Sequence, residues 1–435
     1  VQNIAVNWDS QQKEIYIGCQ NAIKAVSGTL EEMWEVKTGP VGSPDCETCK
    51  LCDVEADPED PVDTDSEVLV LDPAGILLPY LYVCGSTQHG ICYFIDIESP
   101  EHAPQCLYKK QRNSPTRCPD CLASPLGTKV SIIEDGSTTY FFVAAAVDDR
   151  VAQRYPRRSI SVMRPLSTED GFEMVTDGLT VLPSRSTYKI DYIHSFATKE
   201  YVYFLSLQRE NPSNSNSPLQ TRLGRLPISI REVWMYREVV LECHFNPGDF
   251  RGIVYNGLQA AHFGRAGKDL AEELRVDEQE DILYGVFAVV NELGETQRNS
   301  ALCAFPLSKV NHAIDEGVEA CCRSGTEQLS RGLGHFQPLE SCPHESSEDK
   351  YTCRSKPTLV AQPHYRLDLF NRKMRDVLFT TVMVTTTGNH TLGHFGTSDG
   401  RILQVILSLY RPIVFANYSL GDGEVSRTAA VYSED

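Results

Sequence analysis

The feature that most constrains the fold is a recurrence of short apolar segments, rich in β-branched and aromatic residues, separated by turn residues. Segments of this kind are typical of β-strands. A helical pattern occurs in two places only, over residues 268–276 and 310–322. We therefore expect an all-β chain with few helices. The clearest strand segments are residues 75–86, 138–147, 192–208, 281–290, 376–387 and 400–407.

Three turns carry residues that suit tight β-hairpins. They are residues 134–137 (Glu-Asp-Gly-Ser), 387–389 (Thr-Gly-Asn) and 398–400 (Ser-Asp-Gly). In each, Gly, Asn or Asp can adopt the positive φ that a short hairpin loop requires. These turns predict antiparallel pairing between neighbouring strands.

The unit of apolar strand, polar turn and aromatic strand recurs about every 50 to 70 residues, which is typical of a β-propeller. An array of β-sandwich domains is the alternative, but it would need linkers, and the polar stretch 211–220 is better interpreted as a protruding loop. We expect one β-propeller over residues 1–435, truncated at both ends, because the chain begins in the middle of a strand pattern. Residues 53–67 would form an acidic surface insertion, and residues 244–280 an insertion of loop and helix.

Charge and hydropathy exclude several functions. The formal net charge of −19 argues against nucleic-acid binding, which depends on Lys and Arg neutralising phosphates. No apolar run approaches the roughly 20 residues of a transmembrane helix. Residues 53–67 contain eight carboxylates. We interpret them as a solvated surface segment; a calcium site is the alternative, although the spacing is not that of an EF-hand loop.

Fifteen cysteines raise the question of metal, redox chemistry or disulfides. The stretch PDCETCKLC (44–52) resembles half of a zinc ribbon, and CPDC (118–121) has the spacing of a redox motif. However, a second pair of zinc ligands is missing nearby, and no βαβ pattern surrounds CPDC. Two sequons, at Asn389 and Asn417, favour a secreted chain. We expect disulfides, with neither metal nor cofactor.

Eight motifs in order resemble the sema domain of the MET receptor tyrosine kinase subfamily, and this resemblance implies a seven-bladed β-propeller. Three further stretches, DTDSEVLVLDPA (63–74), IDEGVEACC (314–322) and FANYSLGDG (415–423), resemble most the branch of the macrophage-stimulating protein receptor, in a non-human form. The eight motifs are KTGPVGSPDCETCKLC, VCGSTQHGIC, CPDCLASPLGTKV, RSISVMRPL, YIHSF with YFLSLQRE, LQAAHF, CAFPL and GTSDGRILQV.

The resemblance also implies a disulfide pairing, in which the last two pairs could be crossed. Cys19 would remain a buried free thiol. The implied pairs are Cys46–Cys52, Cys49–Cys106, Cys84–Cys92, Cys118–Cys121, Cys243–Cys303, Cys321–Cys342 and Cys322–Cys353.

The sequence contains no P-loop, HExxH or dinucleotide-binding fingerprint. We expect no catalysis by this chain, because the kinase of such receptors lies elsewhere in the protein. The resemblance implies instead an extracellular module, at the plasma membrane, that binds the serine-protease-like β-chain of macrophage-stimulating protein and that makes contacts between receptor copies. The loops 134–137 and 167–171, with 150–158 nearby, would contact the ligand. The candidate residues are Glu134, Asp135, Ser137, Arg150, Arg157, Glu169 and Asp170.

Three alternatives stay open. The first is the branch of the hepatocyte growth factor receptor, towards which LQAAHF (258–263) leans. The second is a secreted propeller enzyme of glycosidase type, which would need several carboxylates converging on one site. The third is a semaphorin ligand.

Overall fold

The computed structural model divides the chain into two compact units. Unit 1 comprises residues 1–202, 227–233 and 430–435, and unit 2 comprises residues 203–226 and 234–429. The structure describes all residues except 9–12, 54–55, 73–78, 115–116, 137, 149, 152–156, 167–169, 182–187, 230, 246–251, 325–329, 334–335, 337–353, 355, 422 and 431–435.

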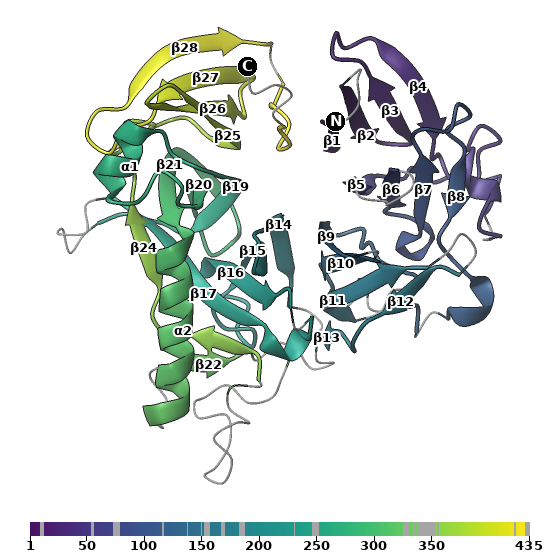
Figure 1. The fold of residues 1–435 in the computed structure, drawn as a ribbon, viewed down its shortest axis with the longest axis horizontal. Coiled ribbons are helices and arrows are strands. Elements are labelled where there is room, and N and C mark those ends of the chain that lie inside the picture. Colours follow the sequence, from purple (N-terminus) through teal and green to yellow (C-terminus); the bar gives the residue numbers. More distant parts are fainter. Residues whose placement is uncertain are drawn as a thin grey trace. The chain divides into compact units, whose positions relative to one another are not determined.

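Unit 1 contains three antiparallel sheets in which strands that are consecutive in the sequence lie side by side (Figure 1). The strand orders are β1-β2-β3-β4, β5-β6-β7-β8 and β9-β10-β11-β12, and β13 pairs with β11. The elements are β1 (Asn3–Asn7), β2 (Glu14–Cys19), β3 (Ala22–Val26), β4 (Glu32–Lys37), η1 (Thr48–Lys50), β5 (Ser66–Asp72), β6 (Tyr80–Gly85), η2 (Gln88–Gly90), β7 (Cys92–Asp96), β8 (Pro104–Cys106), η3 (Lys110–Arg112), β9 (Thr128–Asp135), β10 (Thr138–Ala145), β11 (Arg158–Pro165), β12 (Phe172–Met174), β13 (Leu179–Thr180) and β14 (Ile190–Ala197).

Alternating apolar side chains of these sheets pack face to face. The Tyr82 ring of β6 meets the Phe141 ring of β10 edge to face, with centroids 4.9 Å apart, and Phe141 contacts Phe172 in the same way at 5.4 Å. Pairs in this geometry add about 0.5–1.5 kcal/mol beyond the burial of their area. The sheets of β5–β8 and β9–β12 therefore share one aromatic core.

Unit 2 contains two antiparallel sheets and one mixed sheet. The antiparallel sheets are ordered β19-β20-β21 and β25-β26-β27-β28. The mixed sheet contains the order β15-β16-β17-β23-β22, and β18 and β24 also pair with β17; β23 and β24 run parallel to β17. The elements are β15 (Tyr201–Arg209), β16 (Leu219–Pro227), η6 (Val233–Met235), β17 (Arg237–His244), β18 (Val254–Tyr255), β19 (Gly257–Gly264), α1 (Lys268–Leu274), β20 (Ile282–Val290), β21 (Thr296–Pro306), α2 (Leu307–Ser324), β22 (Ser330–Gly332), β23 (Thr358–Val360), β24 (His364–Leu367), β25 (Phe379–Thr387), β26 (His390–Thr397), β27 (Arg401–Ile406) and β28 (Ile413–Ser419).

The predictions of strands, helices and hairpins are confirmed where the structure describes them. The two helical patterns correspond to α1 and α2. Gly136, Gly388 and Gly400 have φ values of 65°, 57° and 77° in the three predicted hairpin turns. The all-β class with few helices therefore follows from local pattern.

The prediction of seven blades is wrong. Strand pairing among the described residues forms six sheets; five have four or more strands, the size of a propeller blade, and the sheet of β19–β21 has three. The physical reason is the parallel pairing of β23 and β24 with β17, which adds both strands to an existing sheet instead of a separate one. The number seven came from the family resemblance and not from the strand pattern.

The predicted pairing of the three cysteines in PDCETCKLC is also wrong. The structure forms Cys46–Cys49 and Cys52–Cys106, and not Cys46–Cys52 and Cys49–Cys106. The 3₁₀ turn η1 brings the Cα atoms of Cys46 and Cys49 to 5.5 Å, within the range of a disulfide. Cys52 then reaches Cys106 at the end of β8. This bridge anchors the base of the acidic segment 53–67, whose described residues 56–63 are exposed.

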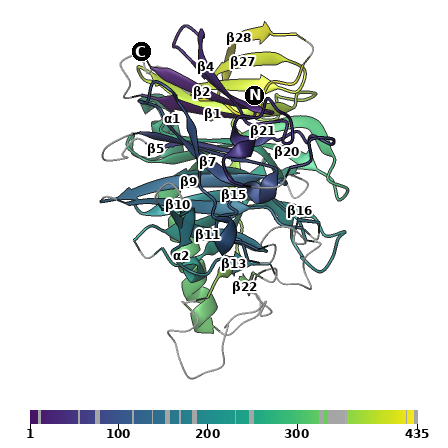
Figure 2. The same cartoon turned by 90° about the vertical axis from the view of Figure 1, so that its right-hand side faces the viewer.

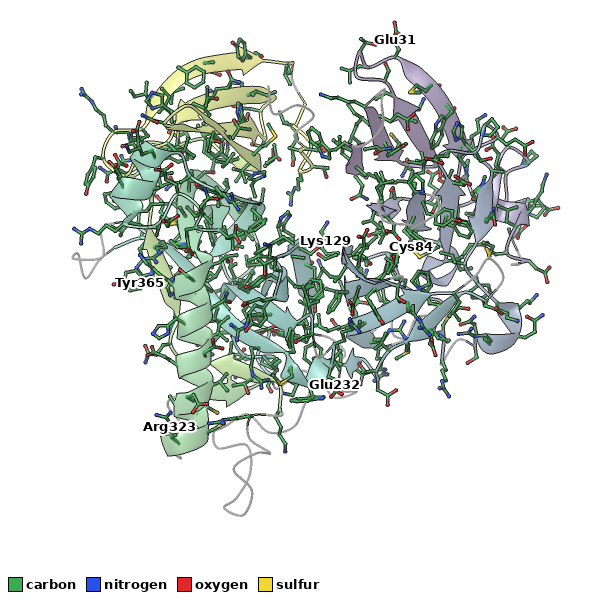
Figure 3. The ribbon with its side chains drawn as sticks, in the orientation of Figure 1. Glu31, Cys84, Lys129, Glu232, Arg323 and Tyr365 are labelled. Carbon is green, nitrogen blue, oxygen red and sulfur yellow. A yellow bond between two sulfur atoms is a disulfide. The ribbon has the colours of Figure 1, made fainter. Side chains whose placement is uncertain are left out.

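The other expected bridges are present where both partners are described. They are Cys84–Cys92, Cys118–Cys121 and Cys243–Cys303, and Figure 3 labels Cys84. Cys19 is the free cysteine of the described part of the chain, and it is partly exposed rather than buried. Cys321 and Cys322 are both disulfide-bonded. Their expected partners, Cys342 and Cys353, lie outside the described residues.

Candidate binding surface

The sheet β9–β12 positions most of the candidate residues. Asp135 pairs with Thr138 at one end of the β9–β10 hairpin, and Pro165 pairs with Phe172 where β11 turns into β12. Since the four strands alternate in direction, both turns lie at the same end of the strands, called one edge of the sheet below. Figure 2 labels β9, β10 and β11 of this sheet. Glu134, Asp135 and Asp170 therefore belong to one edge.

The hairpin turn presents two exposed carboxylates, Glu134 and Asp135. Asp135 forms an ion pair with Arg231 of the segment 227–233, which belongs to the same unit. The Arg231 guanidinium also lies over the Tyr140 ring, 4.0 Å from its centroid. A planar cation held by a carboxylate and an aromatic face is well ordered. The turn is thus supported from a segment about 95 residues further along the chain.

The second turn of this edge is held by basic residues of η3 and its flank. The ammonium of Lys109 lies 3.0 Å from Asp170 Oδ1. Arg112 donates hydrogen bonds to the carbonyl oxygens of Asp170 and Phe172, at 2.5 and 2.6 Å. The Lys109–Asp170 pair is exposed and contributes about 1 kcal/mol or less. The Arg112 contacts fix the backbone, so the acidic turn has a defined position.

Asp120, in the CPDC motif, is a supporting residue that sequence reasoning missed. Its fully buried carboxylate accepts hydrogen bonds from the N–H groups of Phe172 (2.7 Å) and Lys109 (3.0 Å) and from Asn113 Nδ2 (2.6 Å). Gly171, at φ +67°, packs so closely that a Cβ there would lie 2.4 Å from both oxygens. One carboxylate therefore joins three loops. An Asp between the two cysteines of the CPDC motif is the sequence signal that could have identified it.

The CPDC turn is also tied to β11. Arg158 donates a hydrogen bond to the carbonyl oxygen of Cys121 at 2.9 Å. Burial lowers the pKa of the Arg158 guanidinium to about 10, while the nearby Asp120 carboxylate raises it. The Cys118–Cys121 motif thus has a structural role at the base of the acidic edge.

The structure does not bring the remaining candidates to this edge. Arg150 and Arg157 lie in the connection from β10 to β11, at the opposite edge of the sheet. Arg150 is exposed and pairs with Asp148 at 2.8 Å, and Arg157 Nη1 is buried with no hydrogen-bond partner among the described residues. Ser137 and Glu169 lie outside the described residues. The predicted single patch is therefore divided between two edges.

Unit 1 also contains two neighbouring titratable residues, Glu67 and Lys129, that the sequence analysis did not predict as a pair. Burial raises the pKa of the Glu67 carboxyl, on β5, to about 7, although the neighbouring Lys129 lowers it. Burial lowers the pKa of Lys129, on β9, and the Glu67 charge raises it (Figure 3). Such a pair is a common feature of functional sites and of structural ion pairs alike. It places a carboxyl that titrates near neutral pH between the first strands of two sheets.

Two observations on the described parts of the chain bear on metal and hydrolase chemistry. No group of three or more His, Cys, Asp or Glu is arranged there to hold a metal ion. Residues 396–400 (Gly-Thr-Ser-Asp-Gly) match the G-x-S-x-G pattern of hydrolases, which requires a strand-to-helix turn. Here they end β26 and form its turn into β27. Of the helices described, none has the length and apolarity needed to cross a membrane.

Two kinds of comparison with known proteins bear on this chain, one of sequence and one of structure. Residues 258–429 match the Sema domain model. The extracellular region of plexin A4 matches 97% of this chain at 21% identity with a TM-score of 0.76, and this chain spans 43% of that region. The structure of extracellular domains 1–2 of Drosophila semaphorin 1b matches 99% of this chain at 13% identity with a TM-score of 0.58, and this chain spans 81% of that two-domain chain.

These structural matches show the fold. Residues 258–429 thus carry the match to the Sema domain model, and the chain has the all-β fold found in the extracellular regions of plexin A4 and Drosophila semaphorin 1b.

Proposed function

We propose that this chain is the extracellular ligand-binding module of a receptor tyrosine kinase of the MET family. The ordered series of eight motifs favours this subfamily, and three further stretches favour RON, the macrophage-stimulating protein receptor, in a non-human form. Its ligand is then the serine-protease-like β-chain of macrophage-stimulating protein, and the chain itself is non-catalytic. Five complete disulfides among the described residues support an oxidising, extracellular location. The full-length receptor crosses the plasma membrane once.

The observation that carries the proposal is the acidic edge, defined as Glu134, Asp135 and Asp170. The hairpin turn is exposed, a basic side chain pairs with a carboxylate of each turn, and Asp120 accepts a hydrogen bond from the N–H group of Phe172 next to the second turn. Loops on a rigid sheet are the usual carriers of recognition. Exposed carboxylates at the rim of an interface act mainly by steering a basic partner, which raises the association rate.

Reversal of the hairpin charges tests this placement. We expect Glu134→Lys together with Asp135→Lys to slow association with the growth-factor β-chain by about tenfold at low ionic strength, with a change in dissociation of less than about twofold. Surface plasmon resonance at two salt concentrations gives both rates, and the difference should shrink at high salt.

The matched control is Arg150→Glu, a charge reversal at the opposite edge of the same sheet. It should leave the association rate unchanged. Equal association rates for wild type and the double variant at low salt would contradict a ligand site at the acidic edge. Faster association of Arg150→Glu would show that the net charge of the chain acts, and not this edge, because that variant adds negative charge.

A second candidate partner is another Sema-domain protein. One of the matched structures is Drosophila plexin A in complex with semaphorin 1b, with a TM-score of 0.57 and 13% identity to this chain. Binding of a semaphorin instead of a growth-factor β-chain would support this second reading.

A further inference from the structure

The strand β28 (Ile413–Ser419) lies at the free edge of its sheet. Among the described residues the order is β25-β26-β27-β28, so β28 pairs there with β27 on one side only (Figure 1). Edge strands leave a row of backbone N–H and C=O groups that another strand can pair with. Most proteins protect such an edge with charged residues, prolines, bulges or a covering element.

The side chains of β28 make this edge unusually apolar. Ile413, Phe415 and Tyr418 are 50%, 50% and 57% exposed, and Val414 is 46% exposed. The strand contains no charged residue and no proline. One bulge interrupts its register, opposite Gln404 and Val405. A seven-residue strand with β-branched and aromatic side chains and no charge has the composition of segments that self-associate.

Asn417 is placed within this strand. It pairs with Leu403 of β27, its side chain is exposed, and it opens the sequon Asn417-Tyr418-Ser419. It follows Phe415 by two residues and adjoins Tyr418. A glycan attached at this position would cover the most apolar part of the edge. The compartment is suitable, because the chain forms disulfides.

We propose that an N-linked glycan on Asn417 shields the free edge of β28 and prevents its pairing with a second copy of the chain. The glycan takes the place of the charged residues that protect other edge strands. The second sequon does not share this position, because Asn389 lies at the tip of the β25–β26 hairpin. The two sequons thus form a matched pair, with one on the edge strand and one away from it.

The test compares Asn417→Gln with Asn389→Gln, both secreted from cells that glycosylate. Sedimentation velocity over a range of concentrations should show that Asn417→Gln self-associates at concentrations at least tenfold below those at which wild type does. Asn389→Gln should remain like wild type. Adding Phe415→Lys to Asn417→Gln should restore the monomer, because a charge then protects the edge.

If Asn417→Gln is not secreted, the same question can be tested on protein that has already folded with its glycan attached. The variant Asn389→Gln retains a single sequon, at Asn417. When this variant is produced with high-mannose glycans, an endoglycosidase can trim the Asn417 glycan to one sugar while the protein stays folded. Self-association after trimming supports the proposal. Unchanged sedimentation after trimming, an equal effect of Asn389→Gln, or a mass spectrum with Asn417 unmodified would overturn it.

Discussion

Replacing both Cys243 and Cys303 by Ala is expected to lower the free energy of unfolding by about 4 kcal/mol. Their bridge joins β17 to β21 across a sequence separation of 60 residues, and both side chains are fully buried. In the chain-entropy model, the stabilisation grows with the length of the loop that a disulfide closes. For a unit of this size, the loss corresponds to a fall in Tm of roughly 8–16 °C.

The matched control is the replacement of both Cys118 and Cys121 by Ala, since that bridge spans a separation of only 3 residues. The same model gives about 1.5 kcal/mol for so short a ring. Differential scanning calorimetry of the secreted variants compares the two. A Tm that falls equally in both double variants would show that loop closure does not explain the stabilisation.

Removing the Glu238 side chain is expected to lower the free energy of unfolding by a comparable amount. Arg222 Nη1 lies 3.1 Å from Glu238 Oε2, and both side chains are 2% exposed. Glu238 Oε1 also accepts a hydrogen bond from the Tyr236 hydroxyl at 2.8 Å. Glu238→Ala leaves the guanidinium buried without its counter-charge, which costs about 3–5 kcal/mol. Urea denaturation of the secreted variant should show the loss as a lower midpoint.

Two controls distinguish the buried charge from the loss of packing. In the double variant Arg222→Met with Glu238→Leu, the unpaired charge is absent, so its stability should exceed that of Glu238→Ala. The exposed pair Lys24–Glu32, at 2.8 Å, should matter little, and Glu32→Ala should cost about 1 kcal/mol or less. A double variant that is less stable than Glu238→Ala would refute the argument.

Local patterns predicted the local structure of this chain. The strand over 138–147, the helix over 310–322 and the three hairpin turns depend on neighbouring residues, and each is present as β10, α2 or a turn. The number of sheets depends on which distant strands pair. Since β24 joins β17 in parallel across about 120 residues, no local pattern could show it.

The stretch PDCETCKLC illustrates the same limit on a smaller scale. Its composition, with the sequons and the other cysteines, predicted disulfides rather than metal. The choice among Cys46, Cys49 and Cys52 depends on the 3₁₀ turn at 48–50 and on the distance to Cys106, and the resemblance chose the wrong pairs.

The sequence predicted the acidic turns of the candidate site, but it did not predict the residues that hold these turns in place. Glu134 and Asp135 were visible as turn residues, but the Arg231 that holds Asp135 comes from a distant segment. The resemblance also implies that Arg150 lies close to these loops. Strand direction places it at the other edge.

The central claim is that this chain binds the β-chain of macrophage-stimulating protein. Its most direct test is a titration of the secreted chain with that β-chain, with the β-chain of hepatocyte growth factor as the comparison. We expect saturable binding of the first that is at least tenfold tighter than that of the second. Tighter binding of the hepatocyte growth factor β-chain, or no binding of either, would contradict the proposal.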